Sequence, residues 1–273
     1  MHSTSGRLGR LARRILAGTV GILALAACGG SQSDSGNSIV VHPDSERYKP
    51  EGDEGLGVSV AIVLDNSGSM RDKAPGDERR KFEVAKTAIE RTLDATEAAL
   101  TKRPDYPVKV SLILFSDRTE TILEMQPYNR DSVRAAINRL PRPSGGTAIG
   151  DAMDVARQAL YKAGTFRKVM LVVTDGENNA GQNPADMAHE IFKKSQGGVG
   201  IYFVAFDTDA DKFAFLRDVK GDVVSAQNGA ALEASLASLY EGKVLAEAAV
   251  EPSTVIDSSR RTDSVKSTPR SPQ

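Results

Sequence analysis

Oxygen-bearing side chains gather in three separate stretches of this 273-residue chain. In the first, Asp65-Asn66-Ser67-Gly68-Ser69, an acid and two hydroxyls occupy alternate positions. The second, Ser144-Gly145-Gly146-Thr147, is glycine-rich and ends in a hydroxyl, and the third, Thr174-Asp175-Gly176, supplies another carboxylate. Such oxygens are hard ligands that suit Mg²⁺, Mn²⁺ or Ca²⁺ and not zinc. The candidate metal ligands are Asp65, Ser67, Ser69, Thr147 and Asp175.

Nitrogen and sulfur ligands are scarce. The three histidines, His2, His42 and His189, are scattered, and the single cysteine, Cys28, has no partner for an internal disulfide. The sequence therefore does not favour a zinc centre or a histidine-dependent triad, because both need grouped histidine or cysteine side chains. The chain also has no G-x-x-x-x-G-K-[ST] loop and no G-x-S-x-G elbow around Ser67, which argues against nucleotide hydrolysis and serine-nucleophile chemistry.

Two of the three stretches directly follow short β-branched runs. The run at 58–64 leads into Asp65, and the run at 169–173 leads into Thr174 and Asp175. Such runs are typical of strands buried on both faces. Similar runs lie at 108–115 and 201–206, with weaker ones at 121–123 and 223–224.

Helical patterns lie between these runs. Apolar residues spaced by three and four indicate helices over 82–100, 149–160, 188–192, 213–216 and 232–239. Strands that alternate with helices predict an α/β fold, in which one doubly wound domain has a mostly parallel central sheet with helices on both faces. In such sheets ligands bind beyond the carboxyl ends of the strands, where the strand order reverses.

The same residues resemble the metal-ion-dependent adhesion site of the von Willebrand factor A domains, which are also called integrin I-like domains. That motif is D-x-S-x-S followed by a distant Thr and a distant Asp in a T-D-G context, and all five positions match. The resemblance covers residues from about 58 to 240. It implies direct coordination by three hydroxyls, with the two acids acting mainly through bound water; the hydroxyls are those of Ser67, Ser69 and Thr147 and the acids are Asp65 and Asp175.

Other interpretations of these residues stay open. Asp65, Ser67 and Ser69 can serve as turn and cap residues, Thr147 can cap the helix that starts at Ala148, and Asp175-Gly176 can be a plain turn. A strand that ends in Asp also resembles haloacid-dehalogenase-like phosphatases, but Ser67 stands where their second Asp is needed.

A second acidic stretch faintly resembles a calcium loop. It contains Asp207, Asp209, Asp211 and Asp218, but Lys212 replaces the required glycine. We interpret it as a solvated strand-to-helix loop with an acidic N-cap.

The N-terminus has the pattern of an export signal. Four arginines between Arg7 and Arg14 precede an apolar run at 15–27, which at 13 residues is shorter than the ~20 needed to span a bilayer. Leu25-Ala26-Ala27-Cys28-Gly29 resembles the bacterial lipoprotein box, which implies a lipidated Cys28. Arg13-Arg14 fits twin-arginine export as well as a plain Sec signal.

These patterns divide the chain into a signal peptide at 1–27, a flexible tether at 28–57, the metal-binding domain at 58–243 and a helix end with a disordered tail at 244–273. Without the four signal arginines, 31 basic residues face 36 acidic ones, a charge near −5 that disfavours nucleic acid as a partner.

We therefore expect a lipid-anchored, extracytoplasmic binding protein, not an enzyme. A divalent cation, Mg²⁺ first with Mn²⁺ or Ca²⁺ as alternatives, would grip an Asp or Glu of a protein partner in cell-envelope adhesion or assembly. The alternatives are a Mg²⁺-dependent haloacid-dehalogenase-like hydrolase, an adaptor of an AAA+ ATPase, which the export signal disfavours, and a module whose metal site is vestigial.

Overall fold

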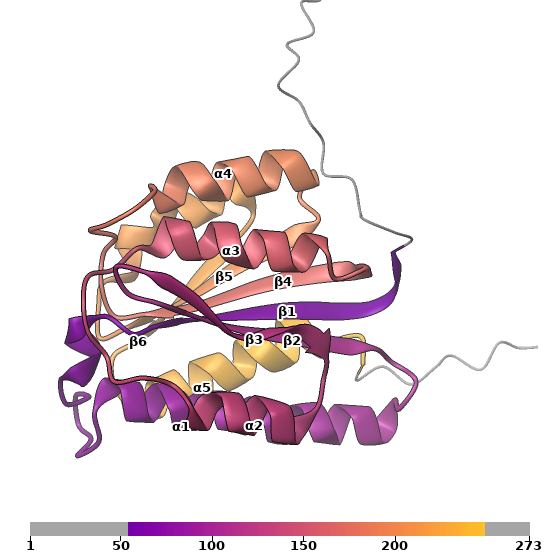
Figure 1. Ribbon diagram of the computed structural model, residues 1–273, viewed down its shortest axis with the longest axis horizontal. Helices are drawn as coiled ribbons and strands as arrows, with labels where there is room; N and C mark the ends of the chain where they lie inside the picture. The colour runs from indigo at the N-terminus through magenta and orange to yellow at the C-terminus, as the bar shows by residue number, and fades with distance from the viewer. Residues whose placement is uncertain (1–53, 249–273) are drawn as a thin grey trace, which may run out of the picture. The chain divides into compact units, whose positions relative to one another are not determined.

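A six-stranded sheet forms the centre of the computed structural model, which describes residues 54–248 (Figure 1). The strand order is β3-β2-β1-β4-β5-β6. Neighbouring strands are parallel except β3, which runs antiparallel to β2. The strands are β1 (Gly55–Asp65), β2 (Val108–Phe115), β3 (Thr119–Pro127), β4 (Thr165–Thr174), β5 (Val199–Phe206) and β6 (Asp222–Ala226).

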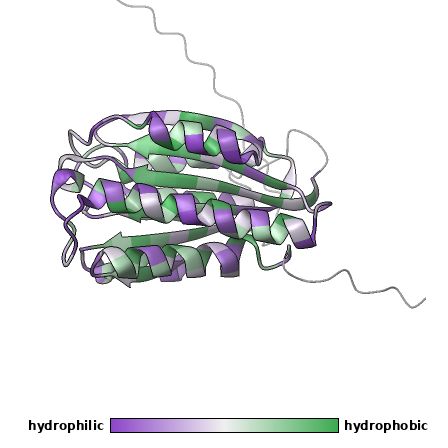
Figure 2. Cartoon of the chain, turned by 90° about the horizontal axis from the view of Figure 1, so that it is seen from below, coloured by the Kyte–Doolittle hydropathy of each residue, from purple (hydrophilic) through white to green (hydrophobic). Residues whose placement is uncertain are grey.

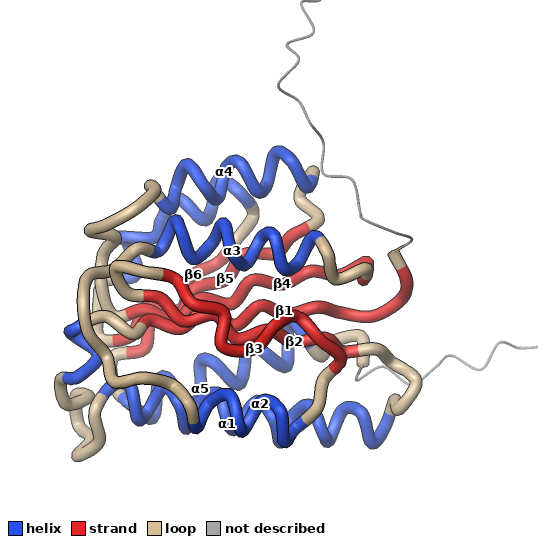
Figure 3. The backbone as a smooth tube through the Cα atoms, viewed as in Figure 1, coloured by secondary structure: helices blue, strands red, loops and turns tan. Residues whose placement is uncertain are grey.

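Helices cover both faces of this sheet, as predicted (Figure 3). One face carries α1 (Lys81–Lys102), α2 (Arg130–Asn138) and α5 (Gly229–Leu239), and the other carries α3 (Ile149–Tyr161) and α4 (Pro184–Ser195). The remaining helices are η1 (Gly68–Arg71), η2 (Ala210–Val219) and η3 (Tyr240–Val244). The described residues form the doubly wound, mostly parallel α/β domain that the sequence predicts.

The sheet buries both faces because side chains alternate along each strand. In β1, Ile62 and Leu64 pack into the cluster that contains α1 and α5, whereas Ala61 and Val63 pack into the cluster with α3 and α4. Figure 2 shows mostly hydrophobic strands beneath helices that alternate hydrophilic and hydrophobic residues. The helices therefore close two separate cores around one sheet.

Some elements differ from the prediction. β1 begins at Gly55, before the expected start of the domain at residue 58, and β3 extends well beyond 121–123. The segment at 213–216 lies in a 3₁₀ helix, η2. α2 was not predicted, because this charged nine-residue helix buries only three residues, namely Val133, Ala136 and Ile137.

Several predicted segments lie outside the described residues. They are the signal at 1–27, the lipidation candidate Cys28, the tether as far as residue 53, and the tail from 249 onwards. Among the helices of residues 54–248, none combines the length and the apolar character required to cross a membrane.

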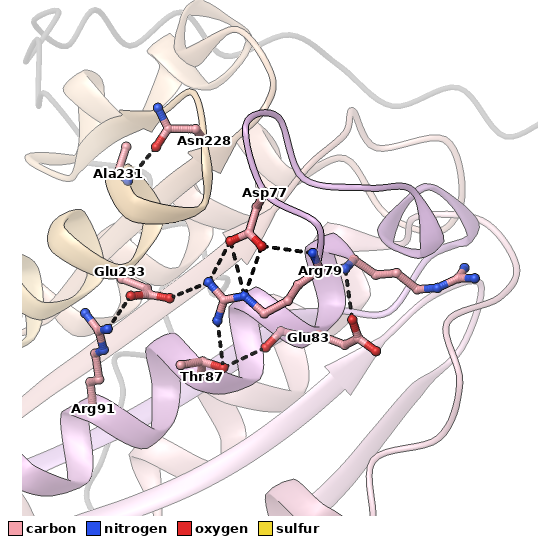
Figure 4. A network of polar contacts seen from close by, with 9 residues as sticks. Asp77, Arg79, Glu83, Thr87, Arg91, Asn228, Ala231 and Glu233 are labelled. Atoms are coloured by element: carbon pink, nitrogen blue, oxygen red, sulfur yellow. Dashed lines mark hydrogen bonds and ion pairs between the residues drawn. The ribbon is translucent and has the colours of Figure 1, made fainter.

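A buried carboxylate joins the helices on one face (Figure 4). Glu233 of α5 accepts Arg79 at 3.1 Å and pairs with Arg91 of α1 at 2.6 Å. Arg79 also holds Asp77 at 2.6 Å, and its hydrogen bond lowers the pKa of Asp77 to about 2. This network fixes the loop before α1, and with it the start of that helix, against α5.

Glu233→Ala should lower the free energy of unfolding by about 1–2 kcal/mol, because two arginines lose a buried acceptor but remain exposed enough to be hydrated. Urea unfolding measures the change. The exposed Glu241→Ala is the control and should stay within about 0.5 kcal/mol of the parent protein. Equal stability of the two variants would contradict a structural role for the network.

Candidate metal centre

The strand order reverses between β1 and β4, and the candidate residues lie at this point. Leu64 of β1 pairs with Val173 of β4 in parallel register. The next residues, Asp65 and Thr174, therefore end side by side at the carboxyl edge of the sheet. The Thr174 hydroxyl donates to Asp65 Oδ2 at 2.6 Å, which joins the two strand ends.

Asp65 is a fully buried carboxylate. Its Oδ1 accepts the backbone N–H of Ser67 at 2.7 Å, so the same side chain also shapes the turn that follows β1. Burial raises the pKa of Asp65 to about 6, although the hydrogen bonds from Thr174 and Ser67 act in the opposite direction. The carboxylate is therefore costly in the absence of a nearby positive charge.

Two serine hydroxyls connect the first loop to the third. Ser67 Oγ lies 3.1 Å from Ser69 Oγ. Ser69 Oγ in turn donates to Asp175 Oδ1 at 2.7 Å, across 106 positions of sequence. Four of the five predicted ligands therefore belong to one hydrogen-bonded group.

Thr147 reaches this group through backbone contacts of its loop. Ser144 N–H donates to the Asn66 carbonyl at 2.8 Å, and Gly68 N–H donates to the Gly145 carbonyl at 3.1 Å. Gly145 has a φ of +82°, a conformation that favours glycine. Thr147 itself is buried, and its N–H donates to Asn179 Oδ1 at 2.8 Å. The second loop thus lies directly against the first.

Helix capping does not account for two of these hydroxyls. The first N–H of α3, from Ile149, is satisfied at 2.7 Å by Asn178 of the β4 loop. The N-cap position itself is Ala148, so Thr147 does not cap this helix. Ser67 stands at the N-cap position of η1 but makes no side-chain cap hydrogen bond there. Neither hydroxyl is explained by a helix end.

Sequence reasoning missed two charged neighbours of the site. Lys81 Nζ lies 3.0 Å from Asp175 Oδ2 and 2.7 Å from Asp207 Oδ2. Burial by itself lowers the pKa of Lys81, but its hydrogen bonds to Asp207 and Asp175 outweigh that cost and raise it. The available signal was that Asp207 follows a buried strand, as Asp65 and Asp175 do.

The faint calcium loop has another explanation. Asp209 Oδ1 accepts the N–H of Asp211 at 2.9 Å and caps η2, as the strand-to-helix interpretation predicts. The first acid of that stretch, Asp207, faces Lys81 and is not part of the cap.

The chemistry of the donor set fits a hard cation. Within residues 54–248, histidine, cysteine and carboxylate side chains form no group of three or more that could hold a metal. The five candidate residues instead supply two carboxylates and three hydroxyls, which are oxygen donors of the kind that Mg²⁺ prefers.

A comparison with protein families agrees with this geometry. Residues 59–235 match the model of the von Willebrand factor type A domain. The chain belongs to this family. Its domains generally mediate protein interactions.

Relatives of this von Willebrand factor type A protein occur in bacteria. An uncharacterized Bacillus subtilis protein, YwmD, is 28% identical over 175 residues, which cover 60% of this chain and 70% of that protein. An uncharacterized Synechocystis protein is 32% identical over 133 residues, or 48% of this chain. The match spans only 28% of the Synechocystis protein, so that relative is much longer than the shared region.

Solved structures share the fold. The PilB minor pilin from Streptococcus sanguinis has a TM-score of 0.56 at 16% identity, over 72% of this chain and 63% of the pilin chain. BatB from Bacteroides thetaiotaomicron has a TM-score of 0.52 at 23% identity, over 70% of this chain and all of the other. At these identities the likeness shows the fold of the von Willebrand factor type A domain and nothing more.

The buried Asp65 should make the metal-free domain more stable as the pH falls from 7 to 5. Its folded pKa of about 6 lies above the ordinary 3.8, so the folded state takes up the proton first. The gain should be about 1 kcal/mol relative to Asp65→Asn, which cannot titrate. Urea unfolding in a chelator measures it, and identical pH slopes for both proteins would contradict the prediction.

Proposed function

We propose that this domain binds an acidic group of a protein partner through a divalent cation, most simply Mg²⁺, with Mn²⁺ and Ca²⁺ as alternatives. The cation would be held at the carboxyl edge of the sheet, between β1, the loop before α3 and the end of β4. The residues proposed to hold it are Asp65, Ser67, Ser69, Thr147 and Asp175.

The observation that carries this proposal is the single group formed by Ser67, Ser69 and Asp175, with distances of 3.1 and 2.7 Å between their oxygens. Asp65 joins the same group because its Oδ1 accepts the Ser67 N–H. Side chains from distant parts of the sequence thus present several oxygens to one place. If these residues only formed solvated turns, their side chains would not need to meet in one place.

The mixture of ligands suits recognition of a partner. Two carboxylates offset the charge of a divalent ion, while neutral hydroxyls donate to it weakly. When bound, the cation would supply an electron-poor position that a partner's Asp or Glu carboxylate can complete. Burial of that ion pair favours binding only with good geometry and further hydrogen bonds, so the site sets orientation as well as affinity.

We place the domain on the outer side of a membrane. The proposal rests on the signal-like residues 1–27 and on Cys28 in its lipoprotein-type box. Two proteins with the same fold support an envelope setting by their descriptions alone: one is a minor pilin and another is an aerotolerance-related membrane protein.

The double change Asp65→Ala with Ser67→Ala should abolish Mg²⁺ binding, because it removes a carboxylate and a hydroxyl from one loop. Isothermal calorimetry on the folded proteins measures the affinity. Glu177→Ala is the matched control: this exposed acid lies two residues from Asp175 but pairs with Lys212 at 3.0 Å, so it should leave the affinity nearly unchanged.

Unchanged Mg²⁺ affinity in the double variant would refute the proposed metal site. Partner capture from an envelope extract that is equal with and without a chelator would instead indicate a vestigial site. Mg²⁺-dependent phosphatase activity that the double variant loses would favour the hydrolase alternative.

Cys28→Ser should release the protein from membranes, because it removes the atom that would carry the lipid. Fractionation of cells that express the full chain measures the membrane-bound share. Ser31→Ala, a change at a neighbouring polar residue, is the control and should stay with the membrane. Equal attachment of the parent and the Cys28→Ser variant would refute the lipid anchor.

A further inference from the structure

A lysine ammonium is built into the candidate metal centre. Lys81 is the first residue of α1 and only 6% of its surface is exposed. Its Nζ lies between two carboxylates that directly follow neighbouring strands, 3.0 Å from Asp175 after β4 and 2.7 Å from Asp207 after β5. The first turn of a helix already carries positive partial charge, so this position is electrostatically unfavourable for a lysine without such partners.

The lysine occupies one oxygen of a proposed metal residue. Asp175 Oδ2 accepts the ammonium of Lys81, and Oδ1 accepts the hydroxyl of Ser69. Both contacts draw negative charge from the carboxylate, so Asp175 donates less to a cation or to a water bound to that cation. Lys81 therefore competes directly with a metal for the charge of this carboxylate.

A charge count shows the consequence. The three carboxylates at this edge, Asp65, Asp175 and Asp207, carry three negative charges when ionised, and Lys81 returns one positive charge. The remaining two balance one divalent cation. Without Lys81 the site would bind a cation more tightly, and without Asp207 the full charge of Lys81 would oppose the cation.

We propose that Lys81 is a positioning residue that weakens metal affinity and keeps the bound cation electron-poor for an acidic partner, and that Asp207 moderates this effect. The inference rests on the proposed function, because it concerns the same centre. Neither residue needs to touch the metal. They act through the carboxylate of Asp175 and through their own charges.

The two residues should shift Mg²⁺ affinity in opposite directions. Lys81→Met nearly keeps the length of the side chain and removes its charge, so the variant should bind Mg²⁺ about tenfold more tightly. Coulomb's law gives an effect of this order for a unit charge a few ångströms from a divalent ion with water-like screening. Asp207→Asn leaves Lys81 less compensated and should bind several-fold more weakly; its effect is smaller because 34% of the Asp207 side chain is exposed.

Isothermal calorimetry with Mg²⁺ alone is the measurement, made on the full chain. Lys81→Arg keeps the charge and should retain the parent affinity within about threefold. Lys86→Met removes a lysine charge from the same helix; Lys86 instead stacks over the Phe82 ring at 5.9 Å, so this control should change little.

Loss of Lys81 leaves the buried Asp175 without its ammonium, so the metal-free Lys81→Met variant should unfold at a lower temperature than the parent. Added Mg²⁺ should then raise its unfolding temperature by more than it raises that of the parent. This second readout also covers a variant that folds only when Mg²⁺ is present.

The outcomes separate this inference from the proposed function. If the parent protein binds no Mg²⁺, both fail. If the parent binds Mg²⁺ but Lys81→Met binds with equal or lower affinity, the metal site stands and the role of Lys81 is refuted. Asp207→Asn that binds as tightly as the parent would refute the moderating role of Asp207.

Discussion

A buried carboxylate at the end of the central strand is the constraint on which this edge of the molecule depends. Asp65 has no exposed surface, and the donors that reach it come from its own turn and from the neighbouring strand β4. An ionised group in this position must be matched by hydrogen bonds or by charge. The turn after β1 and the end of β4 supply the hydrogen bonds, and the proposed cation would supply the positive charge.

The strand order explains why three loops can meet at Asp65. β1 and β4 are neighbours in the sheet, but the chain continues from β1 to β2 on one side and from β4 to β5 on the other. Their parallel register brings the two carboxyl ends to one level, so that loops from different parts of the sequence can meet there. Asn178 and Asn179 then tie the β4 loop to the loop that carries Thr147. The site is a product of loop-to-loop hydrogen bonds supported by a rigid sheet.

Opposing charges also join this edge to the helices. Lys81 connects the start of α1 to the ends of β4 and β5, and Glu233 connects the loop before α1 and the helix itself to α5. The start of α1 is therefore held from both sides.

The sequence by itself determined the architecture and identified the oxygen-bearing side chains that meet at the edge of the sheet. Buried strands show as β-branched runs and long helices as spacings of three and four, because those periods follow from local geometry. All six strands were predicted, but their ends were less certain, since a strand end such as Gly55 depends on pairing with β4. The sequence did not predict α2, because a short, charged helix has little hydrophobic periodicity.

Only the tertiary structure decided which charges meet. Lys81 resembles any surface lysine in the sequence, and its burial between Asp175 and Asp207 depends on contacts across 94 and 126 positions. Likewise, the cap of α3 comes from Asn178, 29 positions after Ile149, and not from the adjacent threonine. Local patterns record the period of an element, whereas the partner of a polar side chain is set by packing between elements that are distant in sequence.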